Sequence, residues 1–156
     1  MIGSKFQPRM AFRMLKVIFY SLNTGLLIFF MAGIYLNDMQ IPGFSQEIDI
    51  LTVVNIFLLG AIPIGYTLSS RKMEAIDPGE PFQEKFQQFQ TAMIIRWAMI
   101  EGAALFSIVG LILLQDAKQL VLFVLCILVL STNTITKEKV TRMAKLNTEE
   151  SKALED

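Results

Sequence analysis

The sequence predicts an all-α membrane protein, with four transmembrane helices in an antiparallel bundle and both termini in the cytoplasm. Of the 156 residues, 53% are hydrophobic, and the mean hydropathy is +0.51, which is typical of membrane proteins. The apolar residues gather in four runs, at about 17–36, 50–68, 92–114 and 117–135. Because about 20 apolar residues can cross a bilayer, each run is a candidate span.

The basic residues predict the orientation. Of the 14 Lys and Arg residues, 12 lie before the first run, between the second and third runs, or after the fourth. The positive-inside rule therefore places these three segments in the cytoplasm. The chain divides into a basic N-terminus (1–16), a membrane domain (17–136) and a charged cytoplasmic tail (137–156). The first basic residue of the N-terminus is Lys5. We expect it in a bacterial-type inner membrane, as a multi-pass protein.

Composition also argues against several function classes. The formal net charge is zero, so nothing indicates a nucleic-acid partner. Histidine, the commonest metal ligand and general base, is absent. Cys126 is the only cysteine, and it lies in an apolar run, where a buried structural role is expected. No metal site, no cofactor and no enzymatic activity are predicted, because no nucleophile–base pair lies in the spans.

The first span follows a basic segment. Pro8 is expected in the first turn of its helix, a position that proline tolerates well. The apolar run from Val17 to Leu36 has 20 residues, too many for the apolar core of a typical signal peptide, so we interpret it as a retained span. A loop at 37–49 separates it from the second span.

Proline lies inside the second span. Pro63 lacks a backbone N–H and its ring clashes with the carbonyl four residues earlier, that of Leu59. Gly60 and Gly65 flank this site, so a helix kink is predicted at Pro63. The freed Leu59 carbonyl should then find a partner within the bundle.

The third helix is expected to begin near Pro81, before the membrane, and to continue through the third span. Four apolar residues recur there at helical spacing and predict a core-facing stripe: Phe82, Phe86, Phe89 and Met93. The link at 115–119 is so short that the third and fourth spans should be antiparallel neighbours. After the fourth span, a helical extension to about Leu146 is expected, with disorder beyond it.

A carboxylic acid, Glu101, stands near the middle of the third span. A helical rise of about 1.5 Å per residue places it about 3 Å from the bilayer centre. A charge there is costly, so Glu101 is expected to be neutral and to have a partner. Asn23, Thr24 and the Leu59 carbonyl lie at similar depth, and Asn55 lies on the other side of the centre.

Arg96 is the second charged residue of the third span. It lies five residues from Glu101, about 140° around the helix, so the two should not form an intrahelical pair. Tyr20 and Tyr66 fall at the same depth as Arg96, about 10 Å to the cytoplasmic side of the centre. The three residues are predicted to form a polar cluster in the inner leaflet.

Small residues surround Glu101 and predict close helix packing. Ala98 with Gly102, and Ala103 with Ser107, are spaced four apart, which lets a second helix approach closely. One hypothesis is therefore an accessory or scaffold subunit, packed through interhelical contacts around a neutral Glu101. Its expected partners are the lipid bilayer, other membrane subunits or further copies of itself.

A second hypothesis comes from a family resemblance. The stretch AMIIRWAMIEGAALFSIVGLIL resembles the second helix of ATP synthase subunit c, the proteolipid, and KMEAI (Lys72–Ile76) resembles the end of that family's first helix. The resemblance covers roughly residues 57–114. It implies that Glu101 corresponds to the family's proton-binding acid. The alternative function is thus a proton-carrying, proteolipid-like subunit with Glu101 as the titrating carboxyl.

Overall fold

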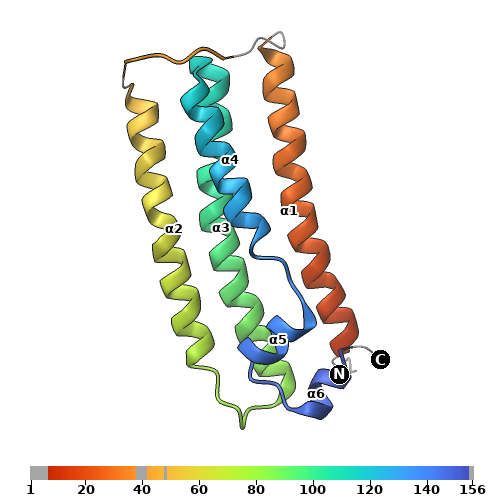
Figure 1. Ribbon diagram of the computed structural model, residues 1–156. Coiled ribbons are helices and arrows are strands. Elements are labelled where there is room, and N and C mark those ends of the chain that lie inside the picture. Colours follow the sequence, from red (N-terminus) through yellow and green to blue (C-terminus); the bar gives the residue numbers. More distant parts are fainter. Residues whose placement is uncertain (1–6, 38–41, 48, 155–156) are drawn as a thin grey trace, which may run out of the picture.

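The structure is a bundle of helices arranged around one central helix. A computed structural model describes residues 7–37, 42–47 and 49–154. Within these residues there are six helices and no strand: α1 (Pro8–Leu36), α2 (Ile50–Glu74), α3 (Phe82–Leu114), α4 (Ala117–Ser131), α5 (Lys137–Met143) and α6 (Thr148–Lys152). Helix α3 packs against α1, α2 and α4 (Figure 1). The all-α prediction is confirmed for the described residues.

Three of the helices are long and apolar enough to cross a membrane. They are α1 with 29 residues, α2 with 25 and α3 with 33, while α4 is a shorter apolar helix. Their packing against one another fits a helical membrane protein. The start of α1, the connection between α2 and α3, and helices α5 and α6 lie at one end of the bundle, here called the basic end (Figure 1). Lys5 and the last two residues of the predicted tail lie outside the described residues.

Two prolines mark helix starts as expected. Pro8 occupies the first turn of α1, and Pro81 is the residue immediately before α3. The stripe predicted to face the core does so for Phe86, Phe89 and Met93, which have no exposed surface, while Phe82 at its start is half-buried. Helix α3 therefore begins well before its apolar segment because its first turns are already packed inside the protein.

Helix α2 begins at a capped N-terminus and continues past its proline. The carboxylate of Asp49 accepts a hydrogen bond from the backbone N–H of Thr52 at 2.8 Å, as a favourable N-cap does. The helix then runs to Glu74 with Pro63 inside it, and the kink predicted there stays a prediction. Gly65 faces α3 so closely that an added Cβ would lie 2.8 Å from Cγ of Met99.

The fourth helix is shorter than predicted. It ends at Ser131, so its 15 residues extend about 22 Å, less than the hydrocarbon core of about 30 Å. The side chains of Ser131, Thr132 and Asn133 hydrogen-bond to carbonyls one turn earlier, at 2.7, 2.7 and 2.8 Å. Polar side chains of this kind compete with the helical backbone pattern. The following segment to Thr136 is irregular, and Asn133 and Ile135 are buried within it.

The tail folds back onto the basic end, so the disorder predicted after Leu146 is wrong. Helix α6 begins with a capping box, in which Asn147 and Glu150 each bond the other's backbone N–H. Leu146 and Leu154 are buried, at 9% and 3% exposed. The Lys145 ammonium donates to the carbonyls of Glu74 and Ile76, at 2.8 and 2.7 Å, which fastens the tail to the end of α2.

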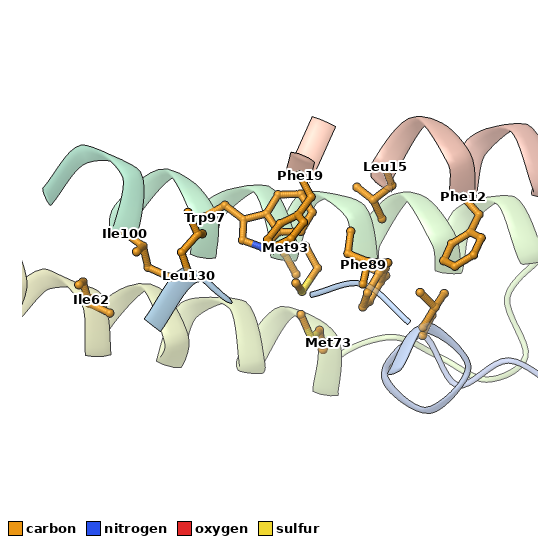
Figure 2. Close-up of a cluster of buried hydrophobic side chains, with 14 of the residues drawn as sticks. Phe12, Leu15, Phe19, Ile62, Met73, Phe89, Met93, Trp97, Ile100 and Leu130 are labelled. Carbon is orange, nitrogen blue, oxygen red and sulfur yellow. The ribbon is translucent and has the colours of Figure 1, made fainter. Parts of the chain in front are cut away.

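The core is one continuous apolar cluster along α3. Figure 2 shows side chains from α1, α2, α4 and α5 converging on those of α3. Trp97 lies at its centre, with the Phe19 ring 5.2 Å away between centroids. The short link between α3 and α4 makes them antiparallel neighbours, as predicted, with Gln115 in the left-handed conformation (φ 49°) that ends α3.

Candidate functional site

Glu101 lies halfway along α3, at the border between the buried and exposed faces of the helix. Its side chain is half-buried, and the next residue, Gly102, is exposed, as is Ala98 one turn earlier. Among the described residues, no hydrogen bond or ion pair involves the Glu101 carboxyl. The small residues that were expected to pack inside the bundle, Ala98 and Gly102, therefore lie on its outer surface beside an unpartnered acid.

The expected partners of Glu101 form no hydrogen bond with it. The Asn23 amide donates to the carbonyl of Phe19 in its own helix, at 2.8 Å. Thr24 is exposed and Leu59 is half-buried. Asn55 is fully buried but bonds to other side chains. The structure therefore does not bring these four residues together around Glu101.

Asn55 instead belongs to a buried hydrogen-bond network that joins α2, α3 and α4, here called the outer network: Asp49, Thr52, Asn55, Ser107 and Gln119. The Asn55 amide donates to the hydroxyl of Ser107 and to the side-chain carbonyl of Gln119, both at 2.7 Å. The Gln119 amide donates to Thr52 at 2.9 Å, and the Thr52 hydroxyl donates to Asp49 at 2.7 Å. The network thus lies toward the end of the bundle opposite to the basic end.

The directions of these bonds are mutually consistent. The Ser107 hydroxyl has a single proton, which it can donate to the carbonyl of Ala103 at 2.9 Å or to the side-chain carbonyl of Asn55 at 3.1 Å, and no buried side-chain atom of the network lacks a partner. Fully satisfied buried networks specify one arrangement of their helices. Asp49 lies at one end of the network. Desolvation raises the pKa of its carboxyl group, but the hydrogen bonds from Thr52 outweigh this effect and hold that pKa below its usual value.

Sequence reasoning missed Gln119 and Thr52 as members of the network. Gln119 follows the helix turn by only a few residues, where a polar residue is expected to face water. Gly110 was the residue in the sequence that could have indicated a buried Gln119. Glycine has no side chain and so leaves room for Gln119, since a Cβ added at Gly110 would lie 2.8 Å from both Cδ and Oε1 of Gln119.

We therefore expect Gly110→Ala to destabilise the protein by about 1 kcal/mol, because it would push Gln119 out of its hydrogen bonds. Gly102→Ala is the matched control on the same helix, since nothing lies within 4 Å of a Cβ added there. Reversible unfolding in detergent micelles would measure both. Equal stability of the two variants would contradict the prediction.

The predicted inner-leaflet cluster forms in part. The Arg96 guanidinium lies over the Tyr66 ring, 4.4 Å from its centroid, and donates through Nε to Ser69 at 2.8 Å. Asn133 donates to the Tyr66 hydroxyl, so the irregular segment after α4 also joins. Tyr20 does not belong to it, since it is exposed on α1 and its ring contacts that of Phe19.

Arg96 and Glu101 point to different sides of α3, as predicted. Arg96 is only 4% exposed, and its bonds are to α2, whereas Glu101 borders the outer surface. The described residues contain ion pairs at Lys85–Glu150 and Lys118–Asp116, and none at Arg96. Arg96 is therefore a buried cation that aromatic and hydroxyl groups stabilise, without a carboxylate among the described residues.

The part of the chain that the structure describes contains no cluster of three or more His, Cys, Asp or Glu residues that could hold a metal ion. Cys126 is fully buried, in line with the expected structural role.

In comparisons with known proteins, no family model, no curated protein and no solved structure matches this chain. The resemblance to subunit c accordingly rests on the sequence stretches quoted above.

Proposed function

We propose that this protein is an accessory or scaffold subunit of a membrane assembly, and that the exposed face of α3 around Glu101 binds a transmembrane helix of a partner subunit. The observation that carries this proposal is the half-buried Glu101 carboxyl, which has no hydrogen-bond partner among the described residues. A carboxyl group within a bilayer normally faces a protein partner or a water-filled cavity. A helix docked on this face could supply the missing partner.

The surroundings of Glu101 suit such a contact. Ala98 and Gly102 are exposed, and a Cβ built on Gly102 has nothing within 4 Å. Small residues at this spacing let two helix backbones approach closely within lipid. Apolar side chains extend the same face, with Ile94, Leu105 and Val109 each 37–41% exposed. The face thus combines close approach, apolar contact and one hydrogen-bonding group.

The proposal includes a membrane topology. The protein would cross an inner membrane four times with both termini in the cytoplasm, and α4 would complete its crossing through the irregular segment that follows it, up to residue 136. The concentration of basic residues in three segments supports this orientation. The role would be non-enzymatic, since the apolar spans offer no nucleophile–base pair beside Glu101.

Three exposed glycines provide a matched test. Gly25, Gly60 and Gly102 lie on α1, α2 and α3, and a Cβ added at any of them meets open space. If the proposal is right, the parent protein should run as part of a large complex when native membranes are solubilised mildly and resolved on a native gel, and Gly102→Leu should abolish that complex. Gly25→Leu and Gly60→Leu should leave it intact. Loss of the complex in all three variants, or in none, would contradict the proposed interface, and a complex formed by the purified chain alone would identify a second copy as the partner.

The second candidate function is the proton-carrying subunit. It is favoured by the same half-exposed carboxyl, because an acid on the outer surface of its helix can meet a neighbouring subunit, and by the resemblance to subunit c. Substitutions of Glu101 separate the two functions. For a scaffold, Glu101→Gln should match the parent, because the amide preserves shape and hydrogen bonding, while Glu101→Leu should weaken the complex by about 1 kcal/mol.

For a proton carrier, Glu101→Gln should be the damaging change, since an amide does not titrate at physiological pH. The complex would then assemble normally but the cells would behave like a deletion strain. The measurement is growth of deletion, Glu101→Gln and parent strains side by side, together with the native gel. A Glu101→Gln strain that grows like the parent, where the deletion strain does not, would end the proton-carrier hypothesis.

A further inference from the structure

Three cations lie near the basic end without a direct ion pair among the described residues. Arg96 is buried, and Lys139 and Arg142 come from α5. Desolvation lowers the pKa of the Lys139 ammonium. The positive charges of Arg96 and Arg142 lower it further. None of the three forms an ion pair within the described residues. The charges of these three cations are therefore not neutralised by a direct contact with a carboxylate.

A pocket of about 230 Å³ opens beside this cluster. It is lined by Ser70, Met73, Glu74, Arg142, Met143 and Lys145. Ser70 connects the pocket to the buried cation, because its hydroxyl lies 3.4 Å from Nη2 of Arg96. Lys139 lies outside the lining and contributes through its charge alone. The pocket is thus a small cavity whose wall carries a hydroxyl and two cations, with a third and fourth cation behind it.

The hydrogen-bond donors on the wall are available for a ligand. Arg142 is exposed and donates no hydrogen bond within the described part of the chain, so the five N–H groups of its guanidinium are uncommitted. The Lys145 ammonium donates two bonds to backbone carbonyls and keeps its third proton. Glu74 is the one acid in the lining, and it opposes an anion. The balance of charge around the pocket nonetheless favours a negative ligand.

We propose that this pocket binds the phosphate headgroup of an anionic phospholipid, in the leaflet at the basic end of the bundle. Arg142, Lys145 and Ser70 would contact the phosphate oxygens, and Arg96 and Lys139 would attract it through their charge. The position argues for a lipid as the source of the phosphate, because the pocket lies where α2 leaves its apolar segment, between that helix and α5. Basic pockets between transmembrane helices at this level suit anionic headgroups. This site is independent of the α3 face proposed above.

The test compares lipids that differ only in headgroup. The full chain, purified in detergent, would be titrated with phosphatidylglycerol or phosphatidylcholine of the same acyl chains, and bound lipid counted by native mass spectrometry. We expect a preference for phosphatidylglycerol of at least about fivefold, and a loss of about fivefold in its affinity in Arg142→Gln, the effect of one cation at a membrane surface. Glu74→Gln should instead tighten binding, because it removes the opposing charge.

Arg71→Gln is the matched control, since Arg71 is an exposed cation in the last turn of α2 that does not line the pocket. It should keep the parent's affinity. Equal losses in Arg71→Gln and Arg142→Gln would overturn the proposal, because they would indicate diffuse surface attraction. Inorganic phosphate that displaces phosphatidylglycerol at low millimolar concentration would overturn the lipid assignment in favour of a free phosphate. Circular dichroism in phosphatidylcholine would verify that each variant is folded.

Discussion

Glu150→Ala is expected to lower the free energy of unfolding by about 3 kcal/mol, because it leaves a buried lysine without its counter-ion. The Lys85 side chain is 1% exposed, and its ammonium lies 2.7 Å from the Glu150 carboxylate, whose side chain is 16% exposed. Removing one member of such a pair costs far more than the pair itself contributes. The same carboxylate oxygen also accepts the N–H of Asn147, so the capping box of α6 would be lost too.

The measurement is unfolding in detergent, combined with limited proteolysis of the tail. Glu149→Ala is the matched control, since Glu149 is an exposed acid in the same first turn of α6, without the lysine partner. It should change stability by no more than about 1 kcal/mol, the usual range for a charge at a helix terminus. In Glu150→Ala the tail should become susceptible to protease, while in Glu149→Ala it should stay protected. The same behaviour in both variants would show that the ion pair does not hold the tail.

A double variant isolates the unpaired charge as the cause. Lys85→Met combined with Glu150→Leu removes both charges and keeps apolar volume, so it should be more stable than Glu150→Ala alone. A double variant that is less stable than Glu150→Ala would indicate that the contact between α3 and α6 depends on the ion pair itself. The contact between α3 and α6 matters for the proposed lipid site, because α6 lies beside α5 at the basic end and α5 contributes residues to the pocket.

The long apolar runs made the helices predictable. They did not predict how each helix is rotated about its own axis. Helix α3 is apolar on nearly every side, so its sequence carries little information about which face is buried. The face with Ala98 and Gly102 was therefore expected inside, and it lies outside. On α2 the same problem affected Asn55, whose buried partners were not predicted. Rotation is fixed by long-range contacts, such as that of Gly65 with Met99, which spacing along one helix does not reveal.

The tail was unpredictable for a different reason. Its buried residues Val140, Leu146 and Leu154 are separated by irregular intervals, because Val140 lies on α5, Leu146 lies between α5 and α6, and Leu154 follows α6. No single helical or strand period describes them, and the ion pair that fastens them joins residues 65 positions apart. The early end of α4, in contrast, could have been inferred from the run of polar residues at 131–134, whose side chains satisfy the last carbonyls of the helix.

After the Lys85–Glu150 ion pair, the outer network is expected to have the largest effect on the free energy of unfolding. Asn55→Leu is expected to destabilise the protein by about 2 kcal/mol, because the side-chain carbonyl of Gln119 would lose its donor while remaining buried. Ser107 would lose the same amide but keep its bond to the Ala103 carbonyl. The loss should also loosen the contact between α2 and α4, which meet through this network.

Asn23→Leu is the matched control, since the Asn23 amide bonds only to a carbonyl of its own helix. Its effect should stay within about 0.5 kcal/mol, as for substitutions away from buried networks. Gln119→Leu completes a double-mutant cycle with Asn55→Leu, and the double variant should lose less stability than the sum of the single ones, because neither partner is left unpaired. Free energies of unfolding for the four proteins of the cycle give the coupling directly. Strict additivity would mean that Asn55 and Gln119 do not stabilise each other, and equal losses in Asn55→Leu and Asn23→Leu would remove the outer network as a source of stability.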